Sequence, residues 1–163
     1  MIEIHIDVDL QILKLLKNHK TYQQYVIATA AKGVGECYGS ERTPRGLHCV
    51  RAKIGAGQPI NTVFVARRPT GEIYTPELAL RYPNRDWILT RILWLSGLEV
   101  AKNRLGNIDS MRRYIYIHGC PDSVVLGKPN SHGCIRMHNA DILELFNLVP
   151  VLTRVFISTK KYQ

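Results

Sequence analysis

The chain has 163 residues, of which 45% are hydrophobic and 21% charged, a globular composition that excludes intrinsic disorder. The length predicts one domain over residues 1–163, long enough to bury a core without disulfide support. The formal net charge of +9 favours polyanionic surroundings, with a solvated basic surface as the alternative. No basic cluster is interleaved with aromatic residues, so we expect no nucleic-acid partner. No apolar run approaches the roughly 18 residues of a membrane span, which excludes a transmembrane protein.

The first part of the chain predicts strands. Polar and apolar residues alternate from Ile2 to Leu10, which is typical of a half-buried strand. Residues 10–30 predict a hairpin, with a short helix over Leu10–Lys17 as the alternative. Five glycines and prolines between Gly33 and Gly46 then indicate a long loop, and loops of this length are more often functional than idle.

The middle of the chain predicts further strands over Leu47–Ile54 and Asn61–Ala66, then a surface loop over residues 69–86 because this stretch holds three prolines. Trp87 to Leu95 is almost continuously apolar, as in a central strand. A short strand over Arg113–Ile117 follows and places His118 at its end.

One helix is predicted late in the chain. Asn139 suits an N-cap, Asp141 opposes the helix dipole, and Pro150 ends the helix. The apolar face consists of Ile142, Leu145, Phe146 and Val149. With a last strand over Val151–Ser158, we count seven or eight strands and one or two helices. The expected fold class is therefore a mainly β domain, β-rich α+β, with a late helix packed on the sheet.

Four cysteines, Cys37, Cys49, Cys120 and Cys134, are too few for a disulfide scaffold, and none forms a Cys-x-x-Cys motif. The amino terminus alternates in polarity and lacks a basic segment followed by an apolar run. The sequence therefore predicts no signal peptide within these residues, and a cytoplasmic location stays open as the alternative to export.

Two short stretches carry the residues of a nucleophilic enzyme: His118-Gly119-Cys120 and the run Ser131-His132-Gly133-Cys134-Ile135-Arg136-Met137. We expect the dipole of the following helix to favour the Cys134 thiolate, and His118 to supply a base. Successive backbone amides around Gly133 are suited to stabilise an oxyanion.

These two stretches resemble the signature of the L,D-transpeptidase catalytic domain, a family of cysteine enzymes that cross-link cell walls. Thr43-Pro44-Arg45-Gly46 resembles a turn of the same family, and the similarity spans residues 2–158. The resemblance implies a mixed β-barrel or sandwich with the cysteine loop at one mouth. It also implies acyl transfer between peptidoglycan tetrapeptide stems, 3–3 cross-linking that serves cell-wall biogenesis and cell shape, sensitivity to carbapenems, and location in the cell envelope or periplasm.

Carried over by position, the resemblance implies Cys134 as nucleophile and His118 as general base, oriented by the Gly119 carbonyl group. The amides of His132, Gly133 and Cys134 would form the oxyanion hole. Ser131 and His132 would shape the loop, and Arg136 would hold it or bind a substrate carboxylate. No metal or organic cofactor is expected, and the protein is expected to be a monomer.

Three features depart from the family pattern: Cys120 follows His-Gly, Leu152 stands where a glycine is usual, and no signal peptide is visible. Cys120 is either a bystander or a disulfide partner of Cys134. Alternative functions are an L,D-carboxypeptidase that hydrolyses the same bond, a non-catalytic wall-binding module, and a zinc module built from His118, Cys120, His132 and Cys134.

Overall fold

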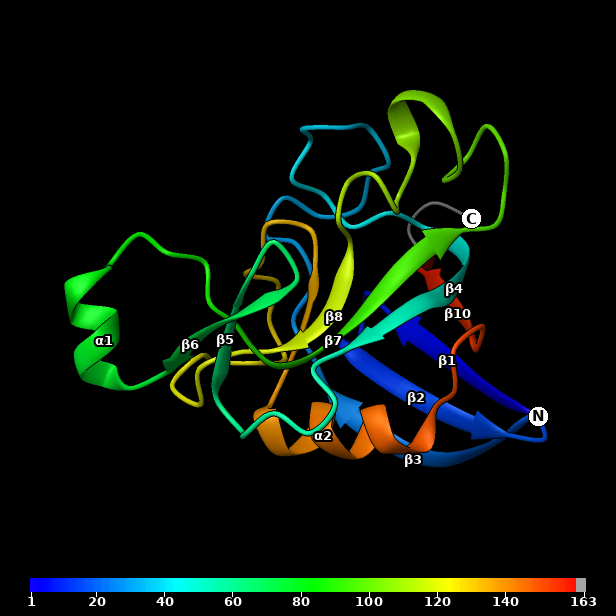
Figure 1. The fold of residues 1–163 in the computed structure, drawn as a ribbon. Coiled ribbons are helices and arrows are strands. Elements are labelled where there is room, and N and C mark those ends of the chain that lie inside the picture. Colours follow the sequence, from blue (N-terminus) through cyan, green and yellow to red (C-terminus); the bar gives the residue numbers. More distant parts are fainter. Residues whose placement is uncertain (161–163) are drawn as a thin grey trace.

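Ten strands form one mixed sheet in residues 1–160, the part of the chain that this computed structural model describes (Figure 1). The strands are β1 (Ile2–Asp7), β2 (Ile12–Lys17), β3 (Lys20–Val26), β4 (Gly46–Ile54), β5 (Thr62–Val65), β6 (Arg68–Ile73), β7 (Ile88–Gly97), β8 (Tyr116–Gly119), β9 (Ile135–Met137) and β10 (Arg154–Ser158). The helices are α1 (Pro76–Arg81), α2 (Asn139–Leu148) and a 3-10 turn over Gly106–Ile108. The predicted fold class, mainly β with a late helix, is confirmed.

The amino-terminal strands follow the predicted alternation. β1, β2 and β3 pair in antiparallel succession, so residues 10–30 contain a hairpin and the alternative helix over Leu10–Lys17 is wrong. Asn18 and His19 form its tight turn, with φ of 50° and 65°. Positive φ at both turn residues matches the right-handed twist of the flanking strands.

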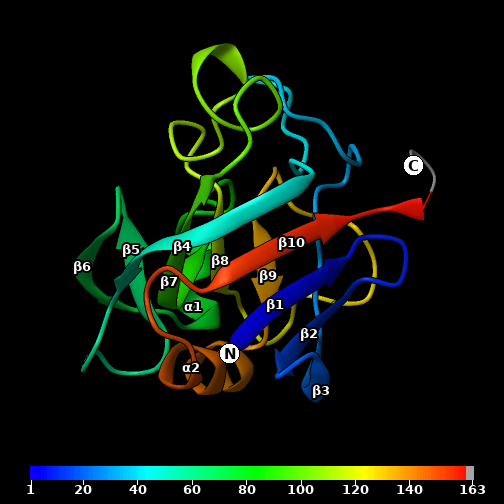
Figure 2. The same ribbon diagram turned by 90° about the vertical axis from the view of Figure 1, so that its right-hand side faces the viewer.

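The carboxyl-terminal strand β10 lies in the sheet between two strands that are distant in the sequence, β1 and β4. It pairs in parallel with β1 and antiparallel with β4, and Figure 2 shows the three strands side by side. The predicted central strand is confirmed, because β7 pairs with β4, β5 and β8. β10 is shorter than expected because residues 151–153 form a turn, in which Leu152 has a φ of 69°. This left-handed conformation favours glycine, the residue that the family resemblance predicts there.

The predicted loop over residues 69–86 is wrong, because it contains most of β6 and all of α1. The prolines are compatible with both elements. Pro69 lies in a strand at the edge of the sheet, where a missing N–H is tolerated. Pro76 is the first residue of α1, a position at which a missing N–H is tolerated. The preceding residue, Thr75, is the N-cap, and its side chain accepts a hydrogen bond from the Leu78 amide.

The late helix α2 packs on β7 and β8 and covers one side of the core (Figure 1). Its N-cap is His138 rather than the predicted Asn139. Asn139 is instead a buried first residue of the helix, and its side-chain amide donates to the Cys120 carbonyl oxygen at 2.8 Å and accepts from Thr90 at 2.6 Å. The helix is thereby tied to the end of β8.

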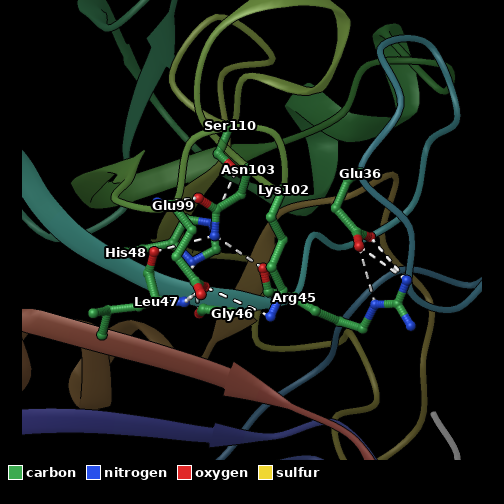
Figure 3. A network of polar contacts seen from close by, with 9 residues as sticks. All are labelled: Glu36, Arg45, Gly46, Leu47, His48, Glu99, Lys102, Asn103 and Ser110. Atoms are coloured by element: carbon green, nitrogen blue, oxygen red, sulfur yellow. Dashed lines mark hydrogen bonds and ion pairs between the residues drawn. The ribbon is translucent and has the colours of Figure 1, made fainter. Parts of the chain in front are cut away.

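A buried polar network fixes the beginning of β4 (Figure 3). His48 is fully buried, with Nδ1 3.0 Å from the Gly46 carbonyl oxygen and Nε2 2.8 Å from Ser110 Oγ. The carbonyl oxygen only accepts, so Nδ1 carries the proton and Nε2 accepts from the Ser110 hydroxyl. The Glu99 carboxylate accepts from the Leu47 amide in the same network. These bonds hold the turn over residues 43–46 against the loop over residues 98–115.

His48 makes the stability of the fold depend on pH. Burial lowers the pKa of His48 from 6.5 to about 4, although the Gly46 carbonyl group and Glu99 act in the opposite direction. Between these two values the unfolded chain binds a proton that the folded chain does not. The free energy of unfolding should therefore keep its full value above pH 6.5 and fall by about 3 kcal/mol as the pH drops to 4. Urea denaturation across this window measures the slope.

The control is His48→Gln, which removes the titrating group and should flatten the slope between pH 6.5 and 4 even if it lowers stability at every pH. Equal slopes in the two proteins would contradict the assignment.

Candidate active site

The parallel pairing of β8 with β9 places the predicted site residues on one face. His118 lies opposite Arg136, and Ile117 opposite Ile135. Side chains alternate along a strand, so His118 shares its face with Arg136 and Cys134, whereas Ile117 and Ile135 enter the core. His118 lies within β8, not after the end of a strand over Arg113–Ile117 as expected.

This register makes Cys134 and His118 diagonal neighbours. A two-residue offset on adjacent strands separates their α-carbons by about 8 Å, a distance that these side chains span. Both residues line one cavity of ≈ 380 Å³, together with Arg67, Tyr116, His132 and Arg136.

The Cys134 thiol is half-buried beside the apolar side chains of Phe64, Ile92 and Tyr116. Sγ accepts from the Tyr116 amide at 3.3 Å and donates to the Tyr114 carbonyl oxygen at 3.4 Å. Burial raises the pKa of the Cys134 thiol to about 12, despite the Tyr116 amide. The expected activation by a helix dipole is wrong, because β9 lies between Cys134 and the first turn of α2. The Cys134 side chain is therefore a neutral thiol at rest.

The His118 ring is buried and oriented by the main chain. Its Nδ1 lies 2.6 Å from the Gly119 carbonyl oxygen, so Nδ1 carries the proton and Nε2 has a free lone pair. Burial lowers the pKa of His118, although the Gly119 carbonyl group and Asp86 favour the charged ring. A neutral imidazole at physiological pH is suited to accept a proton. Gly119 itself has no room for a side chain, because a β-carbon there would lie 2.4 Å from Asn139 Oδ1.

The loop before Cys134 is held by hydroxyl groups. Ser131 Oγ donates to the Cys134 carbonyl oxygen at 2.6 Å and accepts from the Gly133 amide at 3.2 Å. Thr43 Oγ1 donates to the Gly133 carbonyl oxygen at 2.9 Å. The Gly133 amide is therefore engaged within the loop, contrary to the expected oxyanion role, whereas the His132 and Cys134 amides have no hydrogen-bond partner among residues 1–160.

Thr43 holds the cysteine loop through a contact that the sequence does not reveal. Its turn is recognisable as a family feature, but its contact with Gly133 joins residues 90 positions apart. The buried network around His48 (Figure 3) fixes the same turn, because His48 Nδ1 lies 3.0 Å from the Gly46 carbonyl oxygen.

Asp86 is a second residue that the sequence analysis missed, because it lies in the presumed loop over residues 69–86. Its carboxylate accepts from Arg136 Nη2 at 2.8 Å and lies 3.8 Å from the His132 ring. Burial raises the pKa of Asp86, but electrostatic interactions with the His118 ring and with the Arg136 guanidinium, which also donates a hydrogen bond, outweigh burial and hold the pKa below its ordinary value. Arg136 also donates to Asn130 and so joins the loop to β9.

Cys120 is buried at the opposite end of β8 from Cys134. Its thiol donates to the Met137 carbonyl oxygen, and burial raises its pKa to about 11. All four cysteines are free thiols. Cys134 lies level with Tyr116, so about 13 Å of strand separates the two residues. A disulfide needs α-carbons within about 7 Å, so the alternative Cys120–Cys134 disulfide is incompatible with this fold.

The alternative zinc site is likewise not assembled. Within residues 1–160, no group of three or more His, Cys, Asp or Glu side chains is arranged to hold a metal ion. In the same part of the chain, no helix is long and apolar enough to cross a membrane.

Comparisons with known proteins agree with the fold and the motifs. The pattern of the L,D-transpeptidase catalytic domain matches residues 2–157. The Bacillus subtilis protein named "Putative L,D-transpeptidase YkuD" is 47% identical over 95 residues, which cover 58% of this chain and 48% of that protein. The corresponding Bacillus licheniformis protein is 49% identical over 47 residues, 29% of this chain and 28% of its own length. The matches thus span half or less of the length of these relatives.

Solved structures show the same fold. An L,D-transpeptidase from Xylanimonas cellulosilytica superposes with a TM-score of 0.61 at 19% identity, covering 96% of this chain and 60% of that one. An L,D-transpeptidase from Mycobacterium smegmatis gives 0.56 at 15% identity, covering 96% and 58%. Since the family pattern spans nearly all of the sequence, the chain belongs to the family of L,D-transpeptidase catalytic domains.

Proposed function

We propose that this protein is an acyltransferase that cross-links peptidoglycan stem peptides through a Cys134 thioester. The observation that carries the proposal is the shared face of β8 and β9, where a cysteine thiol and a neutral, oriented histidine line one cavity. Family membership supports the reaction class, and a solved neighbour, LdtMt1, is a complex with imipenem.

The first half-reaction forms the thioester. His118 Nε2 takes the thiol proton as Sγ attacks the carbonyl carbon on the L-centre of the diamino acid in a tetrapeptide stem. The two groups are neutral at rest, so proton transfer accompanies attack instead of preceding it. The amide bond to D-alanine then breaks, His118 returns the proton to the leaving amine, and the acyl group remains on Sγ.

The tetrahedral intermediate carries a negative charge on the former carbonyl oxygen. The amides of His132 and Cys134 are the donors available for it, because the Gly133 amide already bonds Ser131. Ser131 and Thr43 act by fixing the loop from which these amides project.

The second half-reaction releases the enzyme. An amine from a second stem attacks the thioester, His118 accepts the amine proton, and Sγ leaves as the thiol after taking that proton. The product is a 3–3 cross-link. Water in place of the amine gives the carboxypeptidase reaction, which uses the same residues; a non-catalytic wall-binding module would carry out neither.

The products distinguish these functions. We expect purified protein incubated with disaccharide-tetrapeptide muropeptides to release D-alanine and yield a dimer lighter than two monomers by one D-alanine. Mass spectrometry with tandem fragmentation reads the linkage. Tripeptide monomers alone would support the carboxypeptidase, and unchanged tetrapeptides would contradict both enzymatic functions. Heat-denatured protein is the control.

A further inference from the structure

Arg67 lies at the tip of the β5–β6 hairpin, which contributes to the wall of the Cys134 cavity. Ala66 and Arg67 form the turn, with φ of 48° and 63°. This is the backbone of a two-residue hairpin turn that usually contains Asn and Gly. Arg67 therefore lines the cavity from a tight turn with a defined backbone conformation.

Aromatic side chains hold the Arg67 guanidinium in place. Its Cζ lies 4.7 Å from the ring centroids of both Trp94 and Tyr114, and Nη1 donates to the Tyr116 hydroxyl at 2.9 Å. Cation–π contacts on two rings and a hydrogen bond fix the orientation of the cation before any ligand binds.

The same guanidinium has no acidic partner within residues 1–160. The two other arginines that line the cavity already bind groups of the protein. Arg136 pairs with Asp86, and Arg113 donates to the carbonyl oxygens of Gly35 and Arg42. Arg67 has five N–H donors and directs one of them to Tyr116. A planar, oriented cation with donors to spare is suited to a carboxylate.

Tyr116 connects this cation to the nucleophile. Its backbone amide donates to Cys134 Sγ, and its hydroxyl accepts from Arg67, so the length of one tyrosine side chain separates the two groups. A carboxylate bound there would belong to the peptide whose carbonyl group Cys134 attacks.

We propose that Arg67 binds a carboxylate of the donor stem peptide and thereby makes the site selective for acidic stems. The proposal rests on the proposed function. The family resemblance implied this role as one option for Arg136, but Asp86 and Asn130 occupy that guanidinium. Two carboxylates are candidates: that of the terminal D-alanine and that on the side chain of an acidic diamino acid.

The test compares Arg67→Met with Arg68→Met, a matched control that removes the same charge at the next, exposed residue of the edge strand. Synthetic tetrapeptides carry both carboxylates free, the terminal one amidated, or the side-chain one amidated. For the free acid, Arg67→Met should lower kcat/KM for release of the terminal residue by about 10–100-fold, the scale of a charged hydrogen bond. Arg68→Met should stay within about twofold of the wild-type protein.

Selectivity then identifies the carboxylate. Amidation of the bound carboxylate should lower kcat/KM of the wild-type protein about as much as Arg67→Met does. It should not lower kcat/KM of the Arg67→Met protein any further. The rate of Cys134 alkylation by iodoacetamide reports whether the site remains intact in each variant. Equal losses on all three peptides would mean that Arg67 acts structurally and would overturn the proposal.

Binding separates this proposal from the proposed function. If the wild-type protein releases no terminal residue from any peptide, the proposed reaction is contradicted. Calorimetric titration with the same peptides still tests whether Arg67 binds a carboxylate. Tighter binding of the free acid by wild-type protein, lost in Arg67→Met and retained in Arg68→Met, supports the carboxylate site. Equal dissociation constants for acid and amides overturn it.

Discussion

Cys134→Ala is expected to abolish turnover of muropeptides, with a loss of at least about 10⁴-fold, because no other described thiol lines the cavity that holds His118. Sγ forms the thioester that holds the acyl group between the two half-reactions, and the methyl group of alanine cannot form such a bond. The fold should survive, since the change removes one half-buried sulfur atom and costs at most about 1 kcal/mol. Mass spectrometry of the products and a thermal melt measure the two effects.

Acylation by a carbapenem gives an independent measure of the same nucleophile. The strained lactam should add one drug mass to the wild-type protein and nothing to Cys134→Ala. Cys37→Ala is the matched control, because Cys37 is the exposed free thiol and should not change the adduct. An adduct that digestion maps to Cys37, or one that persists in Cys134→Ala, would exclude Cys134 as the nucleophile. Prior oxidation should not protect Cys134 through Cys120, because the strand holds the two thiols apart.

Local sequence patterns predict the elements whose stability comes from their own periodicity. The alternation in residues 2–10 and the apolar face of α2 each appear within a dozen residues, and both elements are present. β9 is too short to show any period, yet its parallel pairing with β8 builds the site. That pairing depends on contacts across 18 residues, which no local window contains.

The same limit applies to the site. The motif residues around His118 and Cys134 are recognisable from the sequence because two short stretches resemble the family signature. Asp86 and Arg67 are not, because each is held at the cavity by a partner 50 or 49 residues away in the sequence. The expected thiolate at a helix amino end failed for a related reason. Proximity along the sequence suggested proximity to α2, but an extended strand carries Cys134 away from it.

His118→Gln is expected to slow thioester formation by about 10²–10⁴-fold, the usual contribution of one positioned general base. Gln keeps a similar size and a polar group near the Gly119 carbonyl oxygen but accepts no proton. His138→Gln is the matched control, because that side chain makes no capping hydrogen bond at α2. Single-turnover acylation by a stem peptide, followed by mass, isolates this step.

The pH profiles give the mechanism behind the loss. In the wild-type protein, kcat/KM should decline on acidification only below the ordinary histidine value of 6.5, because burial lowers the pKa of His118 and the neutral ring is the base. In His118→Gln, the thiolate must form by itself. Since the pKa of Cys134 is raised to about 12, the thiolate fraction grows tenfold per pH unit, and the residual rate should climb with that slope between about pH 7 and 10. A His118→Gln protein with the wild-type rate and a flat profile would assign the base to another group at the cavity, with His132 as the first candidate.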